Sequence, residues 1–187
     1  MVARVNELVR LLREGVPEGA NPNRRDYPIS GSIPLPGDYV DTIVEIGSGF
    51  YIDEKFSVLH PRVVSQDFRQ HQDDLVRIHE AEGIYFRDGK LLFPGQFSPD
   101  DDYVRFSKLI CWGLENSGKK VFWDSSGSSD YWHVIATDCS DSWVRHKIKF
   151  SDYLYGILSR ELICPVLTGP AWPRGIVSEL DLHEIDI

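Results

Sequence analysis

Four apolar runs, each with one tryptophan, restrict the possible fold more than any other feature of the sequence. They begin every 11 or 12 residues and occupy residues 108–114, 119–124, 131–137 and 143–149. The segments between them are rich in Gly, Ser, Asn and Asp, which favour tight turns. This spacing predicts an antiparallel β-meander.

The last run has two different faces. Its odd positions hold Trp143 and a basic stripe, whereas its even positions are mostly apolar; the basic stripe consists of Arg145, Lys147 and Lys149. Because successive side chains of a strand point to opposite faces, one face of this strand is expected to be apolar and the other basic.

Helical periodicity appears before and after the meander. Residues 2–14 carry apolar side chains at helical spacing and predict an amphipathic helix. A second helix is expected over residues 36–46, and a third from Pro61 to about Glu82. After the meander, Ser151 or Asp152 is expected to cap a closing helix.

Shorter signals complete the pattern. Residues 50–52 predict a strand, and residues 84–93 predict a hairpin with its turn at residues 87–90. Alternating apolar residues in the tail, residues 173–187, are compatible with one more strand at a sheet edge.

These elements together predict an α+β fold, mainly an antiparallel β-meander sheet flanked by N-terminal helices and a C-terminal helix. We divide the chain into an N-terminal helix (1–14), a loop or linker (15–34), an α+β domain (35–172) and an acidic tail (173–187).

Charge and composition limit the classes of partner. The chain carries a formal net charge of −9, which disfavours nucleic acid and anionic membranes as direct partners. The charge is uneven, because residues 50–103 carry −5 and residues 104–150 carry +2. Three cysteines without a CxxC pair favour reduced thiols, and no apolar segment is long enough for a signal peptide or membrane span. A cytoplasmic location is therefore expected.

Catalytic and metal-binding motifs are missing from the sequence. It contains no GxSxG elbow, P-loop or dinucleotide fingerprint, and His71 and His79 are too far apart on one helix to share a zinc ion. The run of aspartates at residues 100–102 and the loop at residues 124–130 contain carboxylates, but exposed charges and turn hydrogen bonds are favoured over a calcium site. We expect no enzymatic activity, no cofactor and no metal.

The tryptophans of the meander, Trp112, Trp123, Trp132 and Trp143, allow two interpretations. Aromatic residues favour strands, so all four side chains would fit a core. Tryptophan is also enriched at binding hot spots, so at least one exposed indole would fit an interface.

Three groups of motifs resemble the SUKH superfamily, the Smi/Knr cell-wall-regulator and bacterial immunity-protein group. The first is LPGDY at residues 35–39, followed by GSG at 47–49; the second is LICWG at 109–113 with NSG at 116–118 and VFW at 121–123. The third comprises WHVI at 132–135, Trp143 and FSDYL at 150–154. The chain departs from the family at Cys111, in the extra length from Gln96 to Phe106, and in the tail after Pro173.

The resemblance implies a non-catalytic domain, and in bacteria an immunity protein that neutralises a toxin, often a nuclease, by direct binding. Acidic groups would steer the chain to a basic toxin, and aromatic side chains would fill the centre of the interface. The candidate contacts are Asp100, Asp101, Asp102, Trp112, Trp123, Asp124, Asp130 and Trp143. The basic stripe is expected to lie off the interface. A regulatory scaffold of the same superfamily and an enzyme or metal-binding protein that uses the aspartates remain alternatives.

Overall fold

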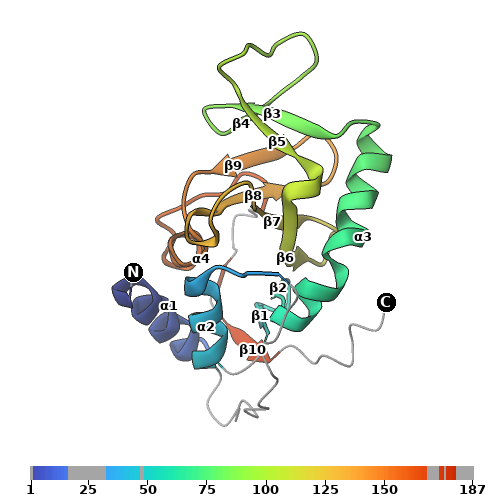
Figure 1. Cartoon of the computed structure of the whole chain (residues 1–187). Coiled ribbons are helices and arrows are strands. Elements are labelled where there is room, and N and C mark those ends of the chain that lie inside the picture. Colours follow the sequence, from blue (N-terminus) through green and yellow to red (C-terminus); the bar gives the residue numbers. More distant parts are fainter. Residues whose placement is uncertain (1, 17–32, 47–48, 168–172, 175, 180–187) are drawn as a thin grey trace.

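The computed structural model describes residues 2–16, 33–46, 49–167, 173–174 and 176–179. In these residues the chain has an α+β architecture, in which helices flank one antiparallel sheet (Figure 1). The helices are α1 (Val2–Glu14), α2 (Gly37–Ile46), α3 (Pro61–His79) and α4 (Phe150–Ser159). None of the helices described is long and apolar enough to cross a membrane.

The sheet has ten described strands in the order β10-β1-β2-β6-β7-β8-β9-β4-β3-β5. They are β1 (Phe50–Ile52), β2 (Phe56–Val58), β3 (Gly83–Arg87), β4 (Lys90–Leu92), β5 (Asp102–Arg105), β6 (Leu109–Glu115), β7 (Lys120–Asp124), β8 (His133–Thr137), β9 (Trp143–His146) and β10 (Val177–Glu179). The predicted meander is confirmed, because β6, β7, β8 and β9 pair in sequence order and antiparallel.

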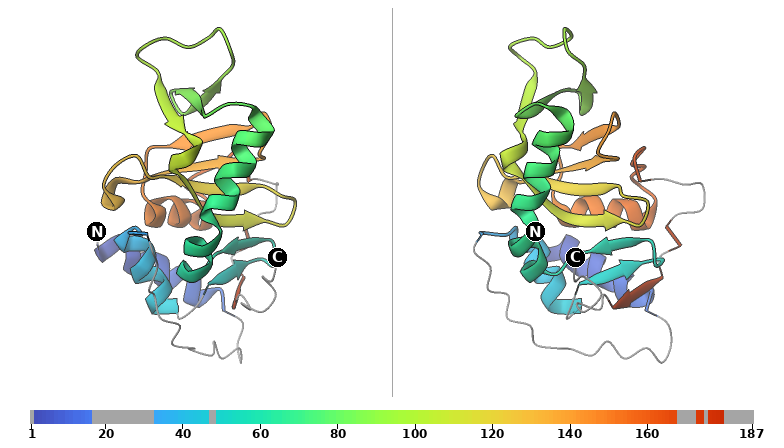
Figure 2. Two further views of the ribbon diagram at one scale, coloured as in Figure 1. Left: turned by 45° about the vertical axis from the view of Figure 1, so that its right-hand side comes forward. Right: turned by 90° about the vertical axis from the view of Figure 1, so that its right-hand side faces the viewer.

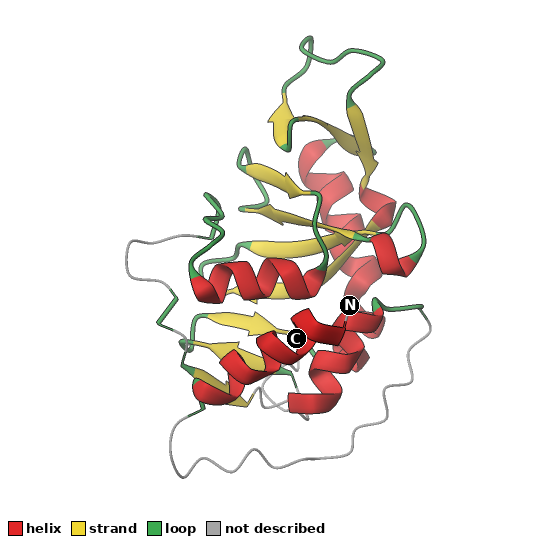
Figure 3. Ribbon diagram, turned by 90° about the vertical axis from the view of Figure 1, so that its left-hand side faces the viewer, coloured by secondary structure: helices red, strands yellow, loops and turns green. Residues whose placement is uncertain are grey.

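Helices cover both faces of the central sheet. Figure 3 shows α1, α2 and α4 in front of the strands and α3 behind them. This arrangement explains why Phe122 and Trp123, which point to opposite faces of β7, are both fully buried. Phe122 lies beside His71 of α3, and Trp123 lies beside Phe150 of α4.

Strands β3, β4 and β5 form a lobe, defined as residues 83–105, that extends away from α1 and α2 (Figures 1 and 2). The predicted hairpin at residues 84–93 is confirmed as β3 and β4. Strand β5 was not expected, since residues 96–106 were interpreted only as extra length. It pairs with β3 along the edge of the sheet and holds the loop of residues 93–101 at the tip of the lobe.

Several predicted boundaries need correction. The closing helix begins at Phe150, before the predicted caps, and its N-cap Lys149 makes no capping hydrogen bond with its side chain. Helix α3 ends at His79 rather than near Glu82, because Glu80 adopts the left-handed conformation. Strand β2 was not predicted.

The two ends of the chain agree in part with the sequence analysis. Helix α1 has the predicted bounds, and an edge strand is present in the tail as β10, which pairs with β1. The alternating residues 180–187, and residues 17–32 of the predicted linker, lie outside the described residues.

Candidate functional site

The indoles expected at the interface lie in the core. Trp112 and Trp123 are 0% exposed and Trp143 is 2% exposed. Trp112 and Trp123 stack with ring centroids 5.7 Å apart, while Trp143 lies 5.5 Å from His79 of α3. Because helices cover both faces of the meander, these side chains pack the core and offer no surface to a partner in this structure.

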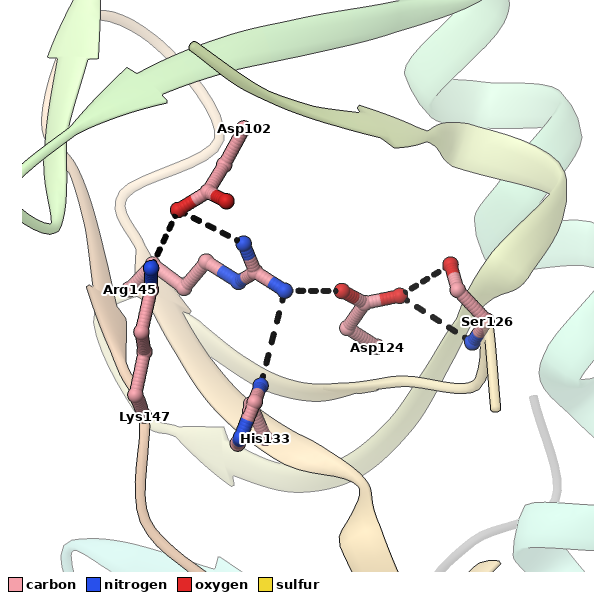
Figure 4. A network of polar contacts seen from close by, with 6 residues as sticks. All are labelled: Asp102, Asp124, Ser126, His133, Arg145 and Lys147. Carbon is pink, nitrogen blue, oxygen red and sulfur yellow. Dashed lines mark hydrogen bonds and ion pairs between the residues drawn. The ribbon is translucent and has the colours of Figure 1, made fainter. Parts of the chain in front are cut away.

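Two of the candidate aspartates belong to an internal ionic network (Figure 4). Arg145 of β9 bridges two strands, with nitrogens 2.7 Å from an oxygen of Asp124 and 3.1 Å from an oxygen of Asp102. Lys147 adds a second cation 2.7 Å from Asp102. The side chains of Arg145 and Asp124 are only 11% and 4% exposed. Their charges therefore compensate each other inside the protein.

The network continues through hydrogen bonds. Asp124 accepts hydrogen bonds from the amide and hydroxyl of Ser126, which agrees with the predicted role of its oxygens in the turn. His133 Nδ1 lies 3.5 Å from a guanidinium nitrogen of Arg145. Burial, followed by the positive charge of Arg145, lowers the pKa of His133. A neutral imidazole is thereby favoured beside the guanidinium.

This network bears on two expectations. Asp102 and Asp124 are paired within the chain, so they are not free acidic contacts. Two members of the basic stripe, Arg145 and Lys147, are the groups that pair with them.

Asp101 also has an internal role. Its two carboxylate oxygens each lie 2.8 Å from a nitrogen of Arg87, and one accepts a hydrogen bond from the amide of Ser98. The hydrogen bond from Arg87, followed by that from Ser98, lowers the pKa of Asp101 to about 2. Asp101 therefore ties the loop of residues 93–101 to β3.

The remaining two candidates, Asp100 and Asp130, are exposed and form no ion pair within the described part of the chain. Of the candidate carboxylates, Asp102 and Asp124 come together on Arg145, and this group includes neither Asp100 nor Asp130. Among the residues placed by the structure, no group of three or more His, Cys, Asp or Glu side chains is arranged to hold a metal ion.

A cluster of aromatic rings, three of them exposed and one half-buried, lies on the lobe. We call it the aromatic patch and define it as Tyr85, Phe93, Phe97 and Tyr103. The ring centroid of Tyr85 is 4.3 Å from that of Phe97 and 4.7 Å from that of Tyr103. Phe93, Phe97 and Tyr103 remain 49%, 43% and 42% exposed. Large apolar side chains grouped on a surface are typical of interaction sites.

Gly83 positions one ring of the aromatic patch. Gly83 lies opposite Arg105, and Tyr103 is two residues from Arg105 on the same face of β5; a Cβ at Gly83 would lie 2.9 Å from Tyr103 Cζ. The same Cβ would lie 2.3 Å from the carbonyl oxygen of Val104. Only glycine fits this close contact between the two strands.

The aromatic patch was missed in the sequence analysis. Tyr85 comes from β3, Tyr103 from β5, and Phe93 and Phe97 from the loop between β4 and β5; the pairing of the unexpected strand β5 with β3 brings Tyr103 against Tyr85. A signal was present in the sequence, because residues 85–103 contain five of its nine Phe and eight Tyr residues.

A comparison of the chain with protein-family models, curated proteins and solved structures finds no match. The resemblance to the SUKH superfamily therefore stays a prediction, and the candidate surface depends on its own geometry.

Proposed function

We propose that this chain is a non-catalytic protein-binding domain that contacts its partner through the aromatic patch of the lobe. The observation that carries the proposal is a group of aromatic rings in contact: Phe97 stacks on the half-buried ring of Tyr85, Tyr103 is tilted against it, and Phe97 and Tyr103 are solvent-exposed. Rings held in place by their neighbours lose little conformational entropy on binding, so they suit the centre of an interface.

We further propose that the chain acts as an immunity protein and that its partner is a basic toxin domain, such as a nuclease. The motif resemblance to the SUKH superfamily supports this function, and so does the net charge of −9. Opposite net charges accelerate association, and neutralisation of a toxin requires that the complex form before the toxin acts.

The ionic network alters which charges would meet such a partner. Asp102 and Asp124 are compensated by Arg145, so exposed carboxylates elsewhere supply the attraction. Asp100 is one such group, because it belongs to the loop at the tip of the lobe. The same pairing removes much of the repulsion that Arg145 and Lys147 would otherwise exert on a basic protein.

Coexpression tests this function. A toxin encoded beside the gene for this chain is produced alone and together with the chain, and cell survival and complex formation are measured. The proposal predicts rescue of growth and a stable complex of the two purified proteins. If no toxin is encoded nearby, or if the toxin stays active in the presence of an excess of the chain, the immunity function is wrong. Binding to a non-toxic neighbour would instead favour the regulatory scaffold.

A further inference from the structure

A groove adjoins the aromatic patch at the open end of the β3–β4 hairpin. It has a volume of about 400 Å³ and lies among the end of α3, the first residues of β3, the residues after β4 and the turn between β8 and β9. Tyr85, Phe93, Phe97 and Tyr103 contribute to its wall, so the groove and the aromatic patch form one surface. The volume is at the lower end of the range of about 300–1,000 Å³ for ligand pockets.

The charge of the groove is negative. Glu82 and Asp141 line it and are exposed, and no Lys or Arg is present among its described lining residues. The carbonyl end of α3, a helix of 19 residues, also points its partial negative charge toward this region. A cationic group would therefore be attracted here.

The nearby arginines do not line the groove. Arg77, in the last turn of α3, lies 2.7 Å from its partner Asp74. Arg105 pairs with Gly83 across the strands but does not line the groove. His79 does line it, and burial lowers the pKa of its imidazole, which favours the neutral form at pH 7.

We infer that this groove binds an arginine side chain presented by the protein partner. The apolar wall would accept the methylene stem, an exposed ring would stack on the planar guanidinium, and Glu82 or Asp141 would pair with its charge. A lysine would gain the charge but not the planar stacking and forked hydrogen bonding. This inference depends on the proposed function, because it names what the partner inserts beside the aromatic patch.

NMR titration of the full chain with argininamide tests the inference without a toxin. Saturable shifts are expected at the amides of Glu82, Tyr85 and Asp141. Citrullinamide, whose side chain has nearly the same shape but no charge, should bind about fivefold more weakly, and lysinamide should also bind more weakly.

Variants identify the groove as the site. The double variant E82Q/D141N should weaken argininamide binding by about fivefold. Glu54 provides a matched control, because it is an exposed carboxylate in the turn between β1 and β2, at the other end of the molecule from the lobe (Figures 1 and 2). The variant E54Q should bind as the unchanged chain does.

Three results would overturn the inference: no saturable shift, equal binding of citrullinamide, or shifts that E82Q/D141N leaves unchanged. Failure here is distinguishable from failure of the proposed function. Rescue from the toxin together with no argininamide binding would reject only the arginine site, whereas argininamide binding without rescue would reject only the immunity function.

Discussion

Arg145 is the residue that most constrains how the acidic side chains of this protein are used. It joins Asp124 of β7 to Asp102 of β5, although these residues lie far apart in the sequence. Removal of one member of a buried ion pair leaves the other charge without compensation, and this costs more than the pair itself contributes. Substitution of a buried member of the network should therefore destabilise the protein strongly, whereas substitution of the exposed member should change its stability little.

Replacement of Arg145 by methionine is expected to lower the free energy of unfolding by about 3 kcal/mol, because Asp124 would remain buried and charged. Lys147→Met provides the control. Lys147 pairs with Asp102 but is 56% exposed, so its loss should cost less than about 1 kcal/mol. Urea unfolding of the two variants measures the difference. Equal costs would show that Arg145 is not held in a buried pair.

His71 makes the stability of the folded protein depend on pH. Burial, followed by the nearby charge of Lys120, lowers its pKa from 6.5 to about 4, and its Nδ1 lies 3.1 Å from Lys120 Nζ. The unfolded chain takes up this proton near pH 6.5, but the folded chain does so only near pH 4. The stability contribution of His71 is therefore complete above pH 6.5 and is lost as the pH falls toward 4.

Unfolding measured between pH 7 and pH 4 should show this loss, worth about 2 kcal/mol after allowance for solvent screening. His71→Gln keeps a hydrogen-bond acceptor but cannot titrate. The decline in stability should therefore be about 2 kcal/mol smaller in that variant. Parallel pH profiles for the two proteins would contradict the assignment.

At the scale of the elements, the first turn of α4 is capped from a distant helix. Asp38 of α2 is 4% exposed, and its Oδ2 accepts a hydrogen bond of 2.8 Å from the amide of Ser151. The helix therefore obtains from α2 the acceptor that Lys149 does not supply. This contact also fixes α4 against α2.

Asp38→Ala should destabilise the protein by about 1–2 kcal/mol, the usual cost of a lost helix cap. Asp41→Ala is the matched control, because Asp41 is on the same helix but exposed, and it should change stability by less than about 0.5 kcal/mol. Thermal unfolding compares the two. Similar transitions for both variants would mean that the hydrogen bond to Ser151 does not stabilise α4.

The sequence allows some elements to be predicted better than others. Strands β6 to β9 repeat one pattern with clear turns between them, and α1 and α3 have strong helical periodicity, so all were found. Strand β5 begins at the last of three consecutive aspartates, a residue type that is uncommon in strands. It pairs with β3, and Arg145 and Lys147 neutralise Asp102 at its start; local sequence reveals neither contact.

The aromatic patch was predicted less well, because local sequence does not show which distant segments cover a strand. Alternation in a strand identifies two faces but does not show which is covered, and here α3 covers one and α4 the other. Trp123 was thus a reasonable candidate that proved to be buried. The lobe has no described helix against its outer face (Figure 1), and it carries three exposed rings, Phe93, Phe97 and Tyr103, none of which was a candidate from the sequence.

For the whole molecule, the structure separates the folded body from the proposed binding surface. The central sheet and its helices contain the buried indoles, whereas the lobe carries the aromatic patch at one end of the protein (Figure 2). Alterations of the exposed rings should therefore affect binding much more than folding.

The most direct measurement is the affinity of the purified chain for the neighbouring toxin domain by calorimetry, with the variant F93A/F97A. We expect the affinity to fall at least about thirtyfold with little change in stability, because two exposed rings of the interface are removed. Ile163→Ala is the control, since Ile163 is 74% exposed and lies after α4, outside the lobe. Unchanged affinity in F93A/F97A, or an equal loss in I163A, would contradict the account.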